Sequence, residues 1–354
     1  MSKFLSEKYK GLEPYTPGEQ PRNAGLIKLN TNESPYDPSP KVIEAINQAE
    51  TEKLRLYSDP EIKELVCAIA DYYDLEDNQV FAGNGSDEIL AFSFMAFQQV
   101  NRKIYFPAIS YGFYPVYGAI FEANAKPIPL TEDLCISIKD YRNLDGTIVI
   151  ANPNAPTGRA LSRLEIEEIL KSNRDNLVLV DEAYVDFGAE SCVPLIAYYD
   201  NLLVVQTFSK SRSLAGARIG FALGNQAIIE DLNKIKFSFN PYNLNRLSIL
   251  AGTAAIKDDE YFQTCINKIV TTREAFVNEL SLLGFKILPS KANFVFAKHE
   301  KLQGDLYLAG LRKNNILVRH FTNPFISDYV RITIGLPQDM GKLLTVTKQL
   351  LLGR

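Results

Sequence analysis

The chain has 354 residues, of which 46% are hydrophobic and 23% charged, as in ordinary folded globular proteins. The net charge of −4 disfavours a surface that binds nucleic acid or anionic lipid, and no apolar run approaches the roughly 20 residues that cross a bilayer. Because the first residues are polar and lack a secretory segment, we expect a cytoplasmic protein with neither nucleic-acid nor membrane partners.

Histidine and cysteine are too sparse to carry several common chemistries. The four cysteines show no paired spacing, which disfavours a disulfide framework or a zinc site. The two histidines, His299 and His320, both lie late in the chain, so a Ser-His-Asp hydrolase or a histidine-rich metal centre is disfavoured too. We therefore predict no metal, and we expect lysine, carboxylates, tyrosines or a cofactor to carry the chemistry.

The first glycine-rich turn follows a predicted strand at 79–82 and precedes a predicted helix. Its sequence is Gly83-Asn84-Gly85-Ser86-Asp87-Glu88. Glycines at such a turn free backbone N–H groups that can bind phosphate at a helix start. A dinucleotide fingerprint would need a third glycine where Glu88 stands, which disfavours a nicotinamide-dependent dehydrogenase. A plain helix cap at Asp87 remains compatible with phosphate binding.

Three continuous apolar runs, at 147–151, 177–180 and 202–205, predict strands that are buried on both faces. Helical patterns such as 164–170 alternate with them. The pattern predicts an α/β fold, with a mostly parallel sheet flanked by helices in a large domain. Each run ends in polar residues, and ligands bind beyond the carboxyl ends of strands in such sheets. The sequence therefore predicts a ligand site at this edge.

The polar residues at the strand ends have either a structural or a functional interpretation. Asn154 lies in the turn Asn152-Pro153-Asn154-Ala155-Pro156-Thr157-Gly158, where it is either turn chemistry or an amide donor. Asp181 could be a metal ligand, a helix cap or a general base, and Tyr184 follows it closely. Lys210 comes after a buried strand, beside Ser209 and eight residues before Arg218. A phosphate held by Ser209 and Arg218 would bring its ring within reach of a Schiff-base-forming Lys210.

The last third of the chain predicts a smaller α+β domain. A long helical region at about 245–284 precedes strand-like pieces at 293–296 and 330–334 and a closing amphipathic helix. We place the domains at 1–40 for an N-terminal arm that joins the small domain, 41–245 for the large domain and 246–354 for the small one. Arg319 and Arg331 in the last part suit carboxylate or phosphate, although either could form a structural ion pair.

These motifs, in this order, resemble the fold-type I enzymes of the class I and II aminotransferase superfamily, which use pyridoxal 5′-phosphate (PLP). Within it, the chain is similar to the histidinol-phosphate aminotransferase family. Further matches support this resemblance over nearly the whole chain: Leu29-Asn30-Thr31-Asn32-Glu33-Ser34-Pro35, Leu56-Tyr57-Ser58-Asp59-Pro60, Ser110-Tyr111-Gly112-Phe113-Tyr114, Pro241-Tyr242-Asn243-Leu244-Asn245, Ile316-Leu317-Val318-Arg319 and Val330-Arg331-Ile332-Thr333-Ile334-Gly335.

The resemblance implies a transamination in histidine biosynthesis, from L-histidinol phosphate and 2-oxoglutarate to imidazole acetol phosphate and L-glutamate. It implies that Lys210 carries PLP as a Schiff base and moves a proton, with Asp181 on the ring nitrogen and Tyr184 on the ring oxygen. The remaining implied cofactor contacts are Gly85, Ser86, Asp87, Tyr111, Asn154, Ser209 and Arg218.

The resemblance also implies partners and a substrate pocket. Tyr57 would reach the cofactor phosphate of a neighbouring subunit, which makes the protein a homodimer. Arg331 would bind the α-carboxylate of glutamate, and Arg319, Tyr15 and Asn32 would line the pocket for the phosphorylated donor.

One position departs from the family pattern. Relatives usually have asparagine directly before the Pro-Thr-Gly turn, whereas this chain has Ala155. The ring-oxygen contact would then come from Asn154 or rest on Tyr184 alone. Arg212, where many relatives carry an apolar residue, either lies near the cofactor phosphate or is exposed.

Alternative functions stay open from the sequence. An aromatic amino acid aminotransferase or a threonine-phosphate decarboxylase could use the same fold. A catalytically silent binding protein is disfavoured, because it would not need the amine of Lys210.

Overall fold

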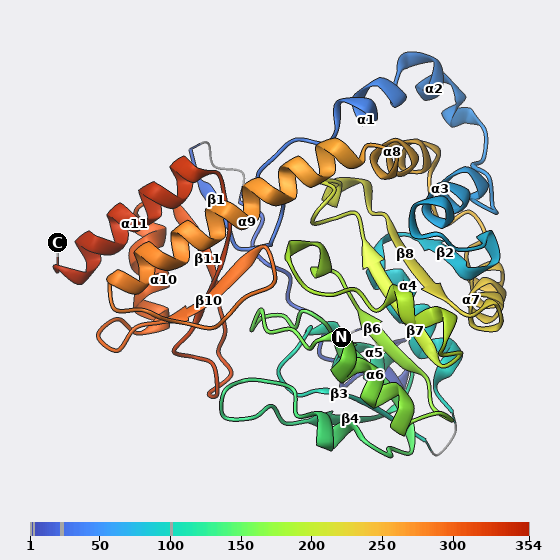
Figure 1. Cartoon of the computed structure of the whole chain (residues 1–354), viewed down its shortest axis with the longest axis horizontal. Coiled ribbons are helices and arrows are strands. Elements are labelled where there is room, and N and C mark those ends of the chain that lie inside the picture. The colour runs from blue at the N-terminus through green and yellow to red at the C-terminus, as the bar shows by residue number, and fades with distance from the viewer. Residues whose placement is uncertain (1, 3, 22–24, 100–101, 354) are drawn as a thin grey trace.

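A seven-stranded sheet forms the centre of the larger unit in the computed structural model, which describes residues 2, 4–21, 25–99 and 102–353 (Figure 1). The strand order is β2-β8-β7-β6-β5-β3-β4, and only the pairs β2–β8 and β8–β7 are antiparallel. The predicted α/β fold with a mostly parallel sheet is therefore confirmed. The strands are β2 (Val80–Gly83), β3 (Lys103–Pro107), β4 (Asn124–Ile128), β5 (Gly146–Ala151), β6 (Val178–Asp181), β7 (Leu202–Thr207) and β8 (Gly220–Gly224).

Successive residues of the central strands enter two different hydrophobic cores. In β6, Val178 and Val180 pack with α3, α6 and α8, whereas Leu179 faces the opposite way and packs with α4, α5 and α7. Side chains alternate across a strand, so a strand covered on both faces must be apolar throughout. The helices of these layers are α3 (Lys63–Tyr73), α4 (Gly85–Phe97), α5 (Phe113–Ile120), α6 (Arg163–Ser172), α7 (Gln226–Phe239) and α8 (Arg246–Ile256).

The smaller unit is built on a five-stranded sheet with the order β1-β11-β12-β10-β9. The N-terminal segment supplies β1, which pairs in parallel with β11. Figure 1 shows the helices of this unit in orange and red beside the sheet. Its elements are β1 (Ile27–Leu29), α9 (Asp259–Leu282), β9 (Lys286–Ile287), β10 (Phe294–Lys298), α10 (Gly304–Lys313), β11 (Ile316–His320), β12 (Val330–Thr333) and α11 (Pro337–Leu351).

The predicted helical region at 245–284 consists of two helices, α8 and α9, which are separated by a short non-helical segment. Asp258 lies between the two helices, where its carboxylate accepts a hydrogen bond from the Ser39 hydroxyl and pairs with Lys41 at 3.2 Å. The α8 helix packs in the core of the large sheet, and the second core begins with Phe262 of α9. We therefore propose that the large domain runs through α8, beyond the boundary that we predicted at 245.

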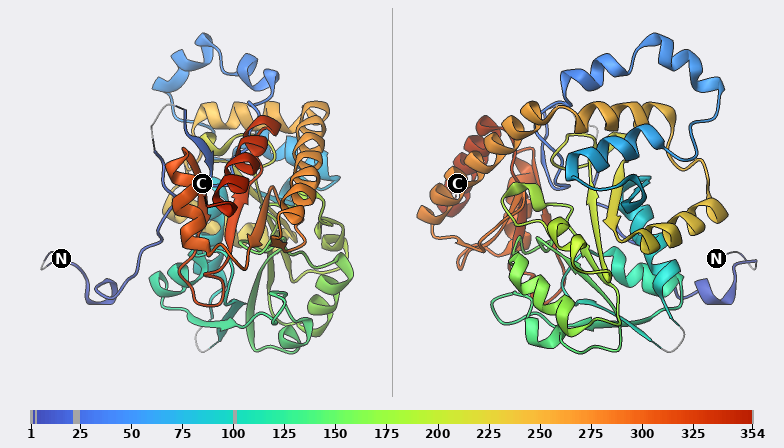
Figure 2. Two further views of the ribbon diagram at one scale, coloured as in Figure 1. Left: turned by 90° about the vertical axis from the view of Figure 1, so that its left-hand side faces the viewer. Right: turned by 45° about the vertical axis from the view of Figure 1, so that its right-hand side comes forward.

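Buried contacts of α9 join the two units. The guanidinium of Arg273 donates to the carbonyl oxygens of Phe187 at 2.9 Å and Ala292 at 2.8 Å. Two short helices, α1 (Pro40–Ala45) and α2 (Gln48–Glu52), project from the large unit, and the N-terminal segment extends from the body (Figure 2). Within the described ranges, no helix has the length and apolar character needed to cross a membrane.

The start of β8 lies so close to the glycine-rich turn that residue 220 must lack a side chain. A Cβ at Gly220 would collide with the backbone nitrogen of Ser86 and, at 2.5 Å, with the carbonyl carbon of Gly85. We predict that Gly220→Ala lowers the free energy of unfolding by about 1–3 kcal/mol, because backbone cannot move aside as a side chain can.

Thermal denaturation of the purified variant checks this prediction. Gly216→Ala is the matched control, since nothing lies within 4 Å of a Cβ there. An unchanged melting temperature for Gly220→Ala would contradict the proposed close packing.

Candidate active site

Two adjoining cavities lie at the carboxyl ends of the central strands. The larger has a volume of about 750 Å³ and the smaller one of about 90 Å³. Tyr111, Ala155, Tyr184 and Lys210 line both cavities and so form their border. The predicted ligand site at this edge of the sheet thus coincides with the two cavities, and Lys210 lies where the two cavities meet.

Asp181 ends β6 and presents a buried carboxylate to the smaller cavity. Its oxygens accept the hydroxyl of Tyr114 at 2.8 Å and the backbone N–H of Ala183 at 3.2 Å. Burial raises the pKa of Asp181 to about 6, although these two donors and the charge of Lys210 act in the opposite direction. The site therefore holds an acid that would ionise fully if a cation lay against it.

Sequence reasoning gave Tyr114 no role, yet its hydroxyl fixes one oxygen of Asp181. A signal was available, because Tyr111 and Tyr114 are three residues apart and lie on one face where α5 begins. The two rings meet edge to face, with centroids 5.8 Å apart.

The glycine-rich turn, Ser209 and Arg218 come together at one end of the smaller cavity. Arg218 donates to Asp87 at 3.0 Å and to the Ser209 hydroxyl at 3.4 Å. Gly85 has a φ of +80°, and a Cβ there would lie 2.6 Å from the Arg218 guanidinium. Helix α4 begins at this turn, so its free N–H groups and the positive end of its dipole lie at this end of the smaller cavity. A guanidinium, a hydroxyl and a helix start are together a phosphate-binding arrangement.

Tyr111 borders the cavities with its hydroxyl bound to Asp87 at 2.6 Å. Lys210 donates to the carbonyl oxygen of Thr31 at 3.2 Å, and its ammonium lies 5.9 Å from the centre of the Tyr184 ring. Tyr184 and Lys210 are thus neighbours at the border of the two cavities.

Asn154 lies away from the cavity where the resemblance implied a cofactor contact. Asn154 does not line the smaller cavity, because its amide donates to Ile109 and Thr157 and accepts from Ser110. Ala155 lines the cavity instead.

Arg212 is neither exposed nor at the cofactor cavity, which corrects both alternatives that we considered. It is buried with its guanidinium 3.8 Å from the centre of the Phe262 ring, and it donates to the carbonyl oxygen of Ala255 at 2.8 Å.

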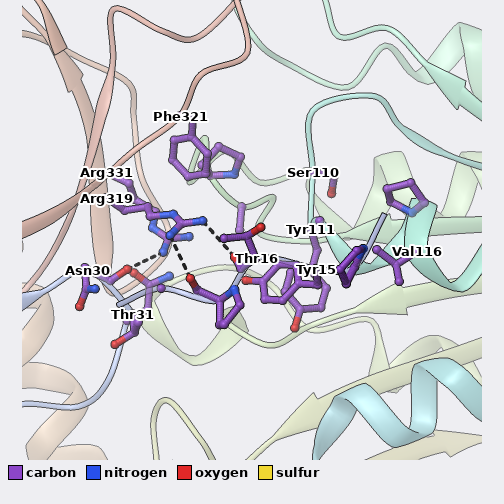
Figure 3. Close-up of a pocket in the computed structure, with 18 of the residues that line it drawn as sticks. Tyr15, Thr16, Asn30, Thr31, Ser110, Tyr111, Val116, Arg319, Phe321 and Arg331 are labelled. Carbon is purple, nitrogen blue, oxygen red and sulfur yellow. Dashed lines mark hydrogen bonds between the residues drawn. The ribbon is translucent and has the colours of Figure 1, made fainter. Parts of the chain in front are cut away.

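The larger cavity carries the two predicted arginines side by side (Figure 3). Arg331 donates to the carbonyl oxygen of Asn30 at 2.9 Å, while its buried Nε has no partner. Burial, and to a lesser extent the nearby Arg319, lowers the pKa of Arg331. An anion between the two guanidinium groups would satisfy the free donor and offset the repulsion.

The N-terminal segment closes one side of the larger cavity. Arg319 donates to the carbonyl oxygens of Thr16 at 3.2 Å and Pro17 at 3.4 Å. Tyr15 stacks on Phe113, with ring centroids 4.2 Å apart, and burial raises its pKa. Phe321, which the sequence did not single out, lies against both arginines, with their guanidinium carbons 5.7 and 5.8 Å from its ring centre.

Tyr57 lies outside both cavities. Its ring is 82% exposed and stacks on Tyr242, with centroids 4.5 Å apart. In the part of the chain that the structure describes, no group of three or more histidine, cysteine or acidic residues could hold a metal ion.

Comparisons with known proteins agree with the geometry of the site. The family described as aminotransferase class I and II matches residues 24–346. A histidinol-phosphate aminotransferase of Brachyspira hyodysenteriae is 54% identical over 342 residues, which are 96% of each chain, and one of Clostridium botulinum is 51% identical over 99% of each. The structure of the Sinorhizobium meliloti histidinol-phosphate aminotransferase in complex with pyridoxal-5′-phosphate is 22% identical, covers 99% of both chains and has a TM-score of 0.87.

The resemblance that the motifs indicated is thereby confirmed. The chain belongs to the class I and II aminotransferase family.

Proposed function

We propose that this protein transfers the amino group of L-histidinol phosphate to 2-oxoglutarate with PLP as cofactor, giving imidazole acetol phosphate and L-glutamate in histidine biosynthesis. One observation carries the proposal: a buried carboxylate, a lysine and a phosphate-binding end surround one cavity, which opens into a second that holds two arginines. The names of relatives at 51–54% identity support the substrate.

The residues of the smaller cavity fit PLP in chemistry and order. When bound, PLP supplies a cationic ring that accepts electrons from the bond broken in the substrate. Asp181 would keep the ring nitrogen protonated, because a cation beside a buried carboxylate stabilises the ionised form of that carboxylate. Ser209, Arg218 and the start of α4 would hold the phosphate.

Lys210 would form the covalent link to the cofactor and act as the proton carrier once substrate displaces it. Its position at the border of both cavities lets the same amine reach the cofactor and the α-carbon of a substrate. The carbonyl oxygen of Thr31 holds the free ammonium in place at 3.2 Å. A positioned general base of this kind accelerates proton transfer by roughly 10²–10⁴-fold.

The larger cavity would bind dianionic substrates at both ends. Arg331 would bind the α-carboxylate of glutamate with its unpartnered Nε and a terminal N–H of the same guanidinium. Arg319 and Tyr15 would face the distal phosphate or carboxylate, since both lie where the N-terminal segment closes the cavity. Excluding water from this space strengthens each of these charge interactions.

An aromatic amino acid aminotransferase and a threonine-phosphate decarboxylase are not favoured. The fold and the cofactor residues would serve all three reactions, so the fold alone does not separate them. The relatives that match nearly the full length of this chain at 51–54% identity are histidinol-phosphate aminotransferases.

A substrate panel tests the proposed reaction. We predict that, with 2-oxoglutarate present, kcat/KM is at least about 100-fold higher for histidinol phosphate than for phenylalanine or tyrosine, because these lack the phosphate that pairs with a guanidinium. It should also be higher than for phosphothreonine, which lacks the imidazole ring. Lys210→Ala should abolish turnover of every donor. Carbon dioxide release from phosphothreonine without an oxo acid would contradict the proposal, and so would faster turnover of an aromatic amino acid.

We also propose that the protein is a cytoplasmic homodimer in which Tyr57 reaches the cofactor phosphate of the partner subunit. The chain that follows the exposed Tyr57 is anchored to the large unit, because Ser58 donates to the carbonyl oxygen of Leu244 and Lys236 donates to that of Pro60. An apolar groove of about 520 Å³ lies beside α1 and α8, where Ile43 is largely exposed. A second copy of the chain would cover this surface.

Hybrid dimers test the crossing of Tyr57. Lys210→Ala lacks the amine, and Tyr57→Ala lacks the proposed phosphate contact. In a hybrid of the two, one site receives both native residues, so mixing equal amounts after dissociation should restore about a quarter of the wild-type sites by random pairing. PLP titration of the mixture measures this recovery. No recovery, together with a monomer in sedimentation experiments, would contradict the shared site.

A further inference from the structure

Asn32 is held so firmly that only its amide nitrogen is free to act on the site. Its φ of +57° is a left-handed conformation, which asparagine tolerates better than most residues. Its backbone N–H donates to the Thr333 hydroxyl at 3.1 Å, that hydroxyl donates to Oδ1 at 3.0 Å, and Asn293 donates to the carbonyl oxygen at 3.0 Å. These bonds direct Nδ2 toward the cavity border.

The partner of this amide is the hydroxyl of Tyr184, which lies 2.9 Å from Nδ2. The Tyr184 ring is itself fixed, because it meets Phe294 edge to face at a centroid distance of 5.1 Å. A phenol that accepts a hydrogen bond keeps its own proton available for donation. The Tyr184 proton is therefore free to point into the smaller cavity, which this residue lines.

Ala155 leaves the Tyr184 hydroxyl without a neighbouring asparagine that could share its contact with the cofactor. The family pattern has an asparagine amide at this position, whereas here a methyl group packs with Ala292 and Phe294 beside Tyr184. The neighbouring Asn154 amide cannot substitute, since it is bound to Ile109, Thr157 and Ser110. Tyr184 therefore carries the hydrogen bonding at this side of the cavity without help from the 154–155 turn.

We infer that Asn32 is a positioning residue that acts through Tyr184, fixing the Tyr184 hydroxyl so that its proton is donated to the ring oxygen of the bound cofactor. This inference rests on the proposed function. The amide also polarises the hydroxyl, because linked hydrogen bonds strengthen one another. Since Thr333 and Asn293 belong to the smaller unit, that unit thereby sets the strength of a cofactor contact in the larger one.

The pH at which the absorption of lysine-bound PLP changes tests this inference, because a donor on the ring oxygen favours the deprotonated link. We predict that Tyr184→Phe raises this midpoint by about one pH unit, the value of one hydrogen bond. Asn32→Gly keeps the left-handed backbone and removes the side chain, with its bond to Tyr184 and the bond it accepts from Thr333, and it should raise the midpoint by roughly half as much. In the double variant, the midpoint should equal that of Tyr184→Phe alone.

Controls separate this inference from folding defects and from the proposed function. Asn143→Gly makes the same substitution at another left-handed asparagine, which is exposed and lines neither cavity, and it should leave the midpoint unchanged. Melting temperatures of the cofactor-free variants report folding, and the uncharged Asn32→Ala repeats the measurement should Asn32→Gly not fold. A wild-type midpoint for the Asn32 variant, or a further shift on the Tyr184→Phe background, would overturn the inference. Absence of any lysine-linked absorption in the wild type would instead overturn the proposed function.

Discussion

A carboxylate buried at the end of a central strand is the constraint on which this site depends. Burial raises the pKa of Asp181 from 3.8 to about 6, so its ionised form is disfavoured by about 3 kcal/mol relative to water. This pKa already includes the hydrogen bonds from Tyr114 and the Ala183 N–H, which lower it without restoring its ordinary value. We propose that a cationic ring against this carboxylate offsets the cost of ionisation, so that the charge serves the function and not the stability of the fold.

The division of the hollow into two cavities assigns separate tasks to the two units of the fold. The ends of the parallel strands supply the smaller cavity, whose residues we propose hold the ring and the phosphate of the cofactor. The smaller unit and the N-terminal segment supply the arginines and the aromatic wall of the larger cavity. Lys210 and Tyr184 line both cavities and stand between them.

Much of this arrangement could be predicted from local sequence, because buried strands and their polar ends have clear patterns. The runs around Val149, Leu179 and Val204 predicted the doubly covered sheet, and Asp181 and Lys210 followed from their places at strand ends. What could not be predicted depends on contacts between distant segments: the break at Asp258, the burial of Arg212 against Phe262, and the bond from Asn32 to Tyr184, 152 residues apart. No periodicity records such contacts, since they form only when the two units pack together.

The affinity for PLP between pH 5 and 8, measured on the wild type and on Asp181→Asn, tests the central claim most directly. Because the cofactor pairs with the ionised form, wild-type affinity should be full above pH 6 and fall as protonation of Asp181 competes below about pH 6. The asparagine variant should bind at least about 100-fold more weakly at pH 8, with that difference shrinking toward pH 5, since it lacks the charge. Equal affinity and equal pH dependence in the two proteins would contradict the account.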